Sequence, residues 1–329
     1  MKSGILASLA ALIVAGCSCE NHTPTSASGE TATSEDPTAP KPGDSAASKN
    51  EPAIPPVDGE VTLVAPLTVV GGANVSVTWT GPGNSSDYID IVPRGATETS
   101  GEIAYSYVRD THGTAIVRAP TAAGEYDIRY VLDMAGPRTV KAVSPLTVTA
   151  AEATLTAPGK VETGQAFDVV WSGPNGESDY IDIVKSGATA TSGEITYAYT
   201  REGSPAKMEA PSAPGAYDVR YLLEGPGGRK VVAKTSLSVT QAQASLKAPA
   251  SVAKGAHFKV EWTGPKSSGD YVDMVEKGVA ATSGEKSYFY VTSTPELTAP
   301  DKAGEYDVRY ILEAPGGRAV LARTTVSVR

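Results

Sequence analysis

The chain has 329 residues, a formal net charge of −9 and a pI near 5.0. This acidity excludes the basic surface that binding to phosphate backbones requires, so we expect no nucleic acid among the partners. The sequence has only two cysteines, Cys17 and Cys19, both close to the N-terminus. The rest of the chain must therefore be stable through packing alone, without disulfides.

The first residues are typical of an export signal. Lys2 is followed by an apolar run from Ile5 to Ala15 and by small residues before Cys17. The run is shorter than the roughly 20 residues that span a bilayer. Residues 14–17 read Val-Ala-Gly-Cys and resemble the lipobox of bacterial lipoproteins. The resemblance implies that residues 1–16 are a lipoprotein signal peptide and that Cys17 carries acyl chains, such as palmitate, that insert into membrane lipid.

An alternative interpretation is an ordinary cleaved signal in which Cys17 is incidental. In lipoproteins an aspartate after the cysteine commonly retains the protein at the inner membrane, and Ser18 stands at that position here. The resemblance therefore implies the outer membrane if the cell is Gram-negative. Cys19 could pair between molecules, carry a second modification or be a surface thiol without a role.

Residues 17–58 are expected to be a disordered tether after the acylated cysteine. Ser, Thr, Pro, Ala and Glu dominate this segment, and few large aliphatic side chains occur in it. Such a composition buries too little apolar surface to offset the entropy of ordering. Its proline content favours extended conformations, so we interpret it as a spacer.

Three copies of one module follow. The strings WTGPGNSSDYIDIV, WSGPNGESDYIDIV and WTGPKSSGDYVDMV begin at Trp79, Trp171 and Trp262. This period indicates repeats of about 90 residues, which we bound at 59–150, 151–241 and 242–329. The connections 149–154 and 240–245 are short, which predicts a rod of three domains with limited bending.

Repeat two shows the pattern of an all-β fold most clearly. Seven short strands are predicted, with turns every 8–12 residues and no helical periodicity, at residues 153–158, 164–171, 179–184, 195–200, 206–211, 215–224 and 229–240. We expect three tandem β-sandwiches of immunoglobulin or fibronectin type. Tyr126, Tyr217 and Tyr306 stand where such folds place a tyrosine corner, with the hydroxyl bonded back to the main chain.

The combined pattern W-[TS]-G-P, D-Y-[IV]-D-[IM]-V, S-G-E, Y-x-Y, A-P and G-x-Y-D-[IV]-R-Y resembles an Ig-like module that recurs in exported bacterial proteins. That module is often attached to von Willebrand factor A domains. The resemblance covers residues 61–329, and no A-type domain or DxSxS metal motif accompanies it here. It implies a fold and an exported location, and no reaction.

Alternation along the strands predicts one candidate binding face. If Ile181 and Ile183 point inward, Tyr180 and Asp182 point outward, and Arg220 on the sixth strand can meet Asp182. The expected face comprises Tyr88, Asp90, Arg129, Tyr180, Asp182, Arg220, Tyr271, Asp273 and Arg309. The alternative is an exposed ladder of ion pairs that keeps the sheet soluble.

Other candidates favour structural roles. Asp87, Asp179 and Asp270, with Glu102, Glu194 and Glu285 in the next turn, could hold Ca²⁺, but capping of turns and strands explains the aspartates better. The three tryptophans could be sugar platforms if exposed, although their place in an alternating strand favours the core. The three histidines, His22, His112 and His257, occupy non-equivalent places.

We therefore predict a protein that is not an enzyme and needs no cofactor. One hypothesis is a lipid-anchored protein that presents Ig-like modules for protein interaction, adhesion or envelope structure. The alternative is a module that binds carbohydrate or Ca²⁺ at the Tyr/Asp/Arg face or at the strand turns. A hydrolase that uses surface carboxylates is the least supported of the three. The partners expected are membrane lipid, through Cys17, and an unknown protein or glycan.

Overall fold

The computed structural model describes residues 59–110, 113–134, 136–267 and 269–329. The predicted signal peptide, Cys17, Cys19, the tether, His22 and His112 lie outside the described residues. Among the described residues, no helix is long and apolar enough to cross a membrane.

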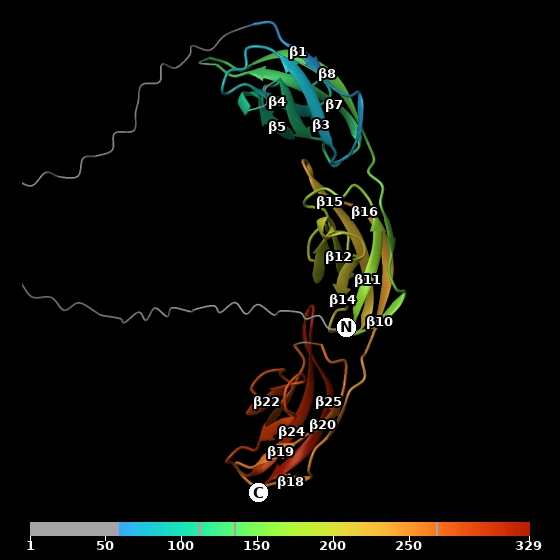
Figure 1. Ribbon diagram of the computed structural model, residues 1–329, viewed down its shortest axis with the longest axis vertical. Coiled ribbons are helices and arrows are strands. Elements are labelled where there is room, and N and C mark those ends of the chain that lie inside the picture. The colour runs from blue at the N-terminus through green and yellow to red at the C-terminus, as the bar shows by residue number, and fades with distance from the viewer. Residues whose placement is uncertain (1–58, 111–112, 135, 268) are drawn as a thin grey trace, which may run out of the picture. The chain divides into compact units, whose positions relative to one another are not determined.

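Apart from two short 3-10 turns, the regular secondary structure of the described residues consists of strands (Figure 1). The first repeat contains β1 (Thr62–Val64), β2 (Thr68–Val70), β3 (Asn74–Thr80), β4 (Tyr88–Pro93), β5 (Ala104–Tyr107), the 3-10 turn η1 (Val108–Asp110), β6 (Thr114–Arg118), β7 (Gly124–Leu132) and β8 (Thr139–Thr149).

The second repeat contains β9 (Thr154–Thr156), β10 (Lys160–Glu162), β11 (Ala166–Ser172), β12 (Tyr180–Lys185), β13 (Thr196–Tyr199), the 3-10 turn η2 (Thr200–Glu202), β14 (Ala206–Glu209), β15 (Gly215–Gly225) and β16 (Gly228–Thr240). The third repeat contains β17 (Ser245–Lys247), β18 (Ser251–Val252), β19 (His257–Lys259), β20 (Glu261–Thr263), β21 (Tyr271–Glu276), β22 (Ser287–Tyr290), β23 (Glu296–Thr298), β24 (Gly304–Ala314) and β25 (Gly317–Val328).

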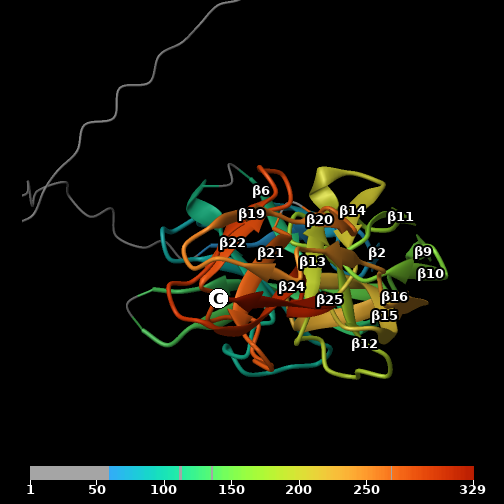
Figure 2. The same ribbon diagram turned by 90° about the horizontal axis from the view of Figure 1, so that it is seen from below.

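Strands pair only within their own repeat, and each repeat has a large and a small layer, although the small layer of the third repeat is divided into the pairs β17-β20 and β19-β23. In the second repeat the small sheet has the order β14-β11-β9 and the large sheet the order β10-β16-β15-β12-β13. Figure 2 shows the large sheet of the third repeat, where β22 lies beside β21 and is followed by β24 and β25. This two-layer arrangement confirms the prediction of tandem Ig-like β-sandwiches.

The core lies between the two sheets because alternate residues of every strand point to the same side. In the second repeat Val169, Ile183, Val219 and Tyr221 are fully buried in one apolar cluster. The tryptophan of each repeat is partly buried against the apolar cluster of its own repeat, and the Trp171 ring lies 5.7 Å from that of Tyr221. The tryptophans thus belong to the edge of the core, as the alternation predicts.

The first strand differs from the prediction. Residues 153–158 are predicted as the first strand, and β9 forms within them, but an additional strand, β10, follows in the other sheet. β9 pairs with β11 in the small sheet, whereas β10 pairs in parallel with β16 in the large sheet. Pro158 stands between the two pieces, and a proline cannot donate a ladder hydrogen bond, so the chain changes sheets there.

The predicted tyrosine corner is present in all three repeats. The hydroxyl of Tyr126 donates to the carbonyl of Ala122 at 3.0 Å, four residues earlier in the chain. Tyr217 and Tyr306 make the same bond to Ala213 at 2.7 Å and Lys302 at 3.0 Å. Each bond fixes the turn that leads into the long strand β7, β15 or β24.

We predict that Tyr126→Phe lowers the free energy of unfolding of the first repeat by about 1 kcal/mol, because one partly buried hydrogen bond is lost. Denaturation followed by hydrogen exchange resolved for each repeat would measure this change. Tyr105→Phe is the matched control, since the Tyr105 side chain is 54% exposed. Equal effects of the two substitutions would contradict a structural role for the corner.

Candidate binding surfaces

A buried ion pair joins β12 and β15 in the second repeat. Arg220 donates from Nε to Asp182 Oδ1 at 3.0 Å and from Nη2 to Oδ2 at 2.6 Å. The two residues face each other in the register of the strands, as the sequence predicts. The first and third repeats contain the same bidentate pair, Arg129–Asp90 and Arg309–Asp273.

These pairs are not exposed, and here the sequence-based expectation is wrong. The six charged side chains are at most 1% exposed, and Tyr88, Tyr180 and Tyr271 are each 4% exposed. The alternation itself is correct, because the neighbouring Ile181 and Ile183 lie in the core on the opposite side of the sheet. The loop between β12 and β13 folds back over the outer side of the sheet and covers the pair.

The arginine holds this loop through its remaining donors. Arg220 Nη1 donates to the carbonyl of Ala190 at 2.6 Å. Arg129 and Arg309 bind their loops in the same way, at Glu98 and Ala281, each at 2.6 Å. The predicted face of Tyr88, Asp90, Arg129, Tyr180, Asp182, Arg220, Tyr271, Asp273 and Arg309 therefore lies beneath the surface, and the alternative of an exposed ion-pair ladder is also wrong.

Burial raises the pKa of the Asp182 carboxyl, and the hydrogen bonds from Arg220 oppose that rise. The same hydrogen bonds raise the pKa of Arg220, so its guanidinium stays charged. A buried charge of this kind is tolerated only while its partner remains.

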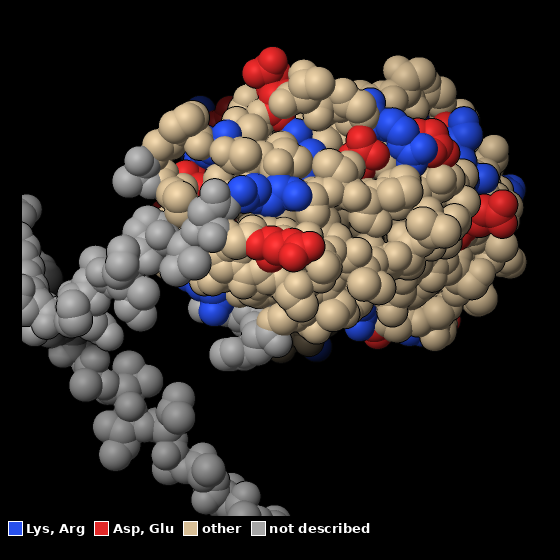
Figure 3. Space-filling view, turned by 90° about the horizontal axis from the view of Figure 1, so that it is seen from above, with Lys and Arg blue, Asp and Glu red and all other residues tan. Residues whose placement is uncertain are grey.

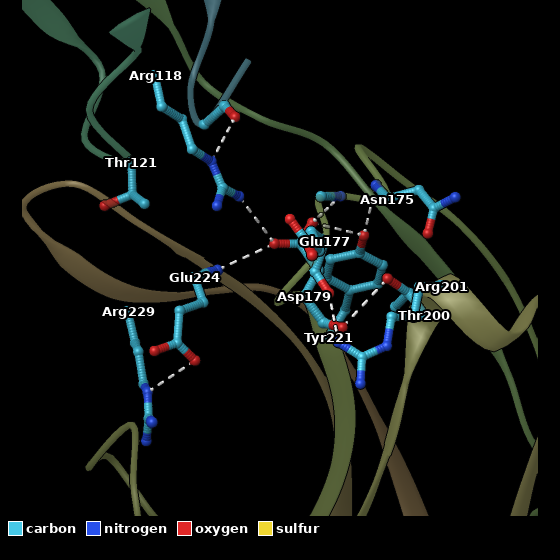
Figure 4. A network of polar contacts seen from close by, with 12 residues as sticks. Arg118, Thr121, Asn175, Glu177, Asp179, Thr200, Arg201, Tyr221, Glu224 and Arg229 are labelled. Atoms are coloured by element: carbon cyan, nitrogen blue, oxygen red, sulfur yellow. Dashed lines mark hydrogen bonds and ion pairs between the residues drawn. The ribbon is translucent and has the colours of Figure 1, made fainter. Parts of the chain in front are cut away.

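A second buried carboxylate lies at the start of β12. Asp179 accepts bonds from the Gly176 N–H at 2.8 Å, the Tyr221 hydroxyl at 3.0 Å and the Glu224 N–H at 3.1 Å (Figure 4). Asp87 and Asp270 have equivalent partners in the other repeats. These bonds confirm the turn-capping interpretation. Within the described ranges, no group of three or more His, Cys, Asp or Glu side chains is placed to hold a metal ion.

Two tyrosines on the outermost strand of the large sheet form an exposed surface in each repeat. Tyr197 is 51% exposed on β13, and its ring lies 5.4 Å from that of Tyr199 and 5.8 Å from that of Tyr180. Arg201 lies over the Tyr199 ring at 4.2 Å. We call these surfaces the tyrosine edges; their tyrosines are Tyr105 and Tyr107 on β5, Tyr197 and Tyr199 on β13, and Tyr288 and Tyr290 on β22.

On a tyrosine edge, alternate backbone N–H and C=O groups point away from the sheet, where an added strand could bind them. The Thr200 N–H donates to Asp179 O at 2.9 Å, which fixes the phase of the antiparallel ladder between β12 and β13. Because inward and outward bonding alternates, Ala198 faces β12 whereas Tyr197 and Tyr199 direct N–H and C=O groups away from it. Val108 and Val291 make the equivalent bonds in the other repeats.

Two buried polar atoms near the tyrosine edge of the second repeat lack a hydrogen-bond partner among the described residues. They are the Tyr180 hydroxyl and Glu194 Oε2. Burial raises the pKa of Tyr180 to about 12, so its hydroxyl remains protonated and able to donate. A ligand hydroxyl could accept a hydrogen bond from the Tyr180 hydroxyl and donate one to the Glu194 carboxylate.

The predicted site residues do not include the tyrosine edges. The motif Y-x-Y belongs to the repeat pattern, and its spacing of two places both rings on the same side of a strand. What the sequence does not show is that the strand is outermost. Figure 3 shows acidic and basic side chains interspersed over one face of the molecule.

No known protein family matches this sequence, and no curated protein sequence matches it either. Solved structures that resemble it include an I-band fragment of titin, with 14% identity over 83% of this chain and 99% of that one at a TM-score of 0.20. The FN1–FN3 domains of chicken CNTN1 show 12% identity over 83% and 98% at a TM-score of 0.23. Latent PorU from Porphyromonas gingivalis shows 11% identity over 82% and 34% at a TM-score of 0.20.

We predict that Asp182→Asn destabilises the second repeat by about 3–5 kcal/mol, because it leaves the Arg220 guanidinium buried without its counter-charge. Replacing both partners, by Asp182→Leu with Arg220→Met, should recover much of this loss. Chemical denaturation measures the changes.

The exposed pair Asp168–Lys207 in the same repeat, 2.8 Å apart, is the matched control. Asp168→Asn should change the free energy of unfolding by at most about 1 kcal/mol. If Asp182→Asn and Asp168→Asn had equal effects, the buried pair would not be essential to the repeat.

Proposed function

We propose that this protein is a lipid-anchored bacterial envelope protein whose Ig-like modules bind extended segments of a partner protein at the tyrosine edges, without catalysis. The observation that carries the proposal is the tyrosine edge itself. It combines outward-facing backbone groups with exposed aromatic rings, and it occurs three times in the chain.

Extended polypeptide is the partner that fits both features. A free strand edge offers main-chain hydrogen bonds to an added strand, while side-chain contacts supply selectivity. Tyrosine contributes apolar area and a polar tip at little cost in conformational entropy, which favours it at interfaces. Each β13-type edge is only four residues long. Simultaneous use of several edges would therefore strengthen an individually weak contact.

The Asp–Arg pairs and the Asp179-type carboxylates support a role without catalysis. These buried charges are already bonded to strands and loops of their own repeat. A charge engaged in this way is not available to transfer a proton to a substrate without disrupting the sandwich.

The lipid anchor rests on the sequence around Cys17. Metabolic labelling with an alkyne analogue of palmitate should label the wild-type protein and Cys19→Ala, and should not label Cys17→Ala. In-gel detection of the attached fluorophore measures the labelling. Label that persists in Cys17→Ala, or is absent from wild type, would contradict the proposal of a lipid anchor at Cys17.

The tyrosine edge is tested by placing a photo-crosslinking amino acid at position 197 in cells. We expect discrete adducts from this position and few from position 170, where Val170 is 54% exposed on the small sheet of the same repeat. Tyr199→Thr in the same chain should reduce the adducts by about tenfold, in line with the loss of an aromatic anchor. Equal crosslinking from positions 170 and 197 would exclude a specific surface.

Carbohydrate remains a second candidate because the unpartnered Tyr180 hydroxyl and Glu194 carboxylate could bind sugar hydroxyls. The substitution Tyr197→Pro distinguishes binding of an extended peptide from binding of a carbohydrate. Proline removes an N–H that points away from the sheet, so the sandwich tolerates it. It should abolish strand addition, whereas the Thr substitution at position 199 removes a ring only. Binding on a glycan array that survives Tyr197→Pro would favour carbohydrate.

A further inference from the structure

Successive repeats contact each other through a hydrogen bond that occurs twice. The Thr121 N–H of the first repeat donates to the carbonyl of Pro226, in the hairpin turn between β15 and β16, at 3.0 Å. The Ser212 N–H of the second repeat donates in the same way to Pro315 of the third repeat at 2.8 Å. Thr121 and Ser212 are 3% and 6% exposed, so both contacts exclude water. The two junctions therefore share this backbone contact.

The first junction also contains a cation opposite a carboxylate. Arg118, the last residue of β6, places Nη2 3.5 Å from Oδ1 of the buried Asp179 in the next repeat (Figure 4). Its Nε donates to the carbonyl of Gly72 at 3.0 Å. A side chain at position 176 would collide with the guanidinium, so Gly176 provides the space that the arginine needs.

The second junction has a carboxylate in place of that cation. Glu209 ends β14 as Arg118 ends β6, and it lines the same cavity as Ser267, whose N–H donates to the buried Asp270, the counterpart of Asp179. Ser267 takes the place of Gly176, and its hydroxyl donates to the carbonyl of Gly164 at 3.3 Å. The Gly164 carbonyl, which corresponds to the Gly72 carbonyl, thus also accepts a hydrogen bond. The opposite charges of Arg118 and Asp179 attract each other at the first junction, whereas the like charges of Glu209 and Asp270 repel each other at the second.

Glu209 borders a cavity of about 490 Å³ between the two repeats. The charged groups around it are Glu162 and Lys266, which also line the cavity, and Asp270. The Glu313 N–H donates to Asp270, and the Glu313 carboxylate forms an ion pair with Arg318 at 3.1 Å. The Glu209 carboxylate forms no ion pair or hydrogen bond with any described residue. Burial raises its pKa, and the charge of Asp270 raises it further.

We propose that the contact between the second and third repeats is a pH-sensitive joint, in which protonation of Glu209 favours docking. When the repeats separate, Glu209 regains water and distance from Asp270, and its carboxyl loses its proton more easily. Docking is therefore strongest at pH values below the ordinary range of a glutamate, and it weakens as the pH rises through the raised pKa of Glu209. The first junction has the cation Arg118 instead and lacks this response.

Hydrogen exchange of two backbone amides in the full-length chain tests the joint. The Ser212 and Thr121 amides report on the second and first junctions under identical conditions. After correction for intrinsic exchange, the protection factor of Ser212 should fall between about pH 4 and pH 8. The fall should be about tenfold for each unit by which docking raises the pKa of Glu209, with Thr121 changing little.

Three variants distinguish the effect of the charge at position 209 from the effect of the side-chain size at position 267. Glu209→Gln should keep Ser212 protected throughout this range. Glu209→Arg combined with Ser267→Gly rebuilds the first junction at the second and should also remove the pH dependence. Ser267→Gly alone should retain it. The proposal is overturned if Ser212 and Thr121 respond equally to pH, or if the response persists in Glu209→Gln.

Discussion

The buried Asp–Arg pair is the interaction on which the outer side of each large sheet depends. In the second repeat it crosslinks β12 and β15, and its third hydrogen bond, to Ala190, holds the loop that leads into β13. The position of the tyrosine edge follows, because that loop determines where β13 begins. Such a pair contributes little net stability compared with apolar packing, but its loss leaves a charge buried without a partner. It therefore specifies the conformation of the loop more than it adds to the stability of the sheet.

One difference between the repeats lies where one contacts the next. Tyrosine corners, buried pairs and tyrosine edges occur in all of them with nearly the same bond lengths. Position 118 and its counterpart 209, by contrast, carry opposite charges. The internal structure of a sandwich thus sets narrow limits on its residues, whereas each junction can be adjusted by one side chain and the space opposite it.

Most of the fold can be predicted from the sequence because the periodicity of two is strong. The alternation of Val169, Ile181 and Ile183 identifies the core side of the strands, and the cross-strand meeting of Asp182 and Arg220 follows from the order of strands in a sandwich. Exposure could not be predicted in the same way. Whether a residue on the outer side of a sheet meets water depends on the path of a loop, and the loop from 186 to 195 has no periodicity to reveal it. For the same reason the sequence pattern predicts that Tyr197 lies in a strand but does not predict that this strand is an open edge.

The contacts made by the hairpin turns allow the number of repeats to vary. Pro226 and Pro315 offer the same carbonyl to the preceding repeat, and Thr121 and Ser212 offer the same N–H to the following one. The second repeat therefore carries both halves of the contact, the carbonyl that the first repeat binds and the N–H that binds the third repeat. An array of this kind can lengthen or shorten by whole units during evolution, and only the charge at positions such as 118 and 209 has to be readjusted.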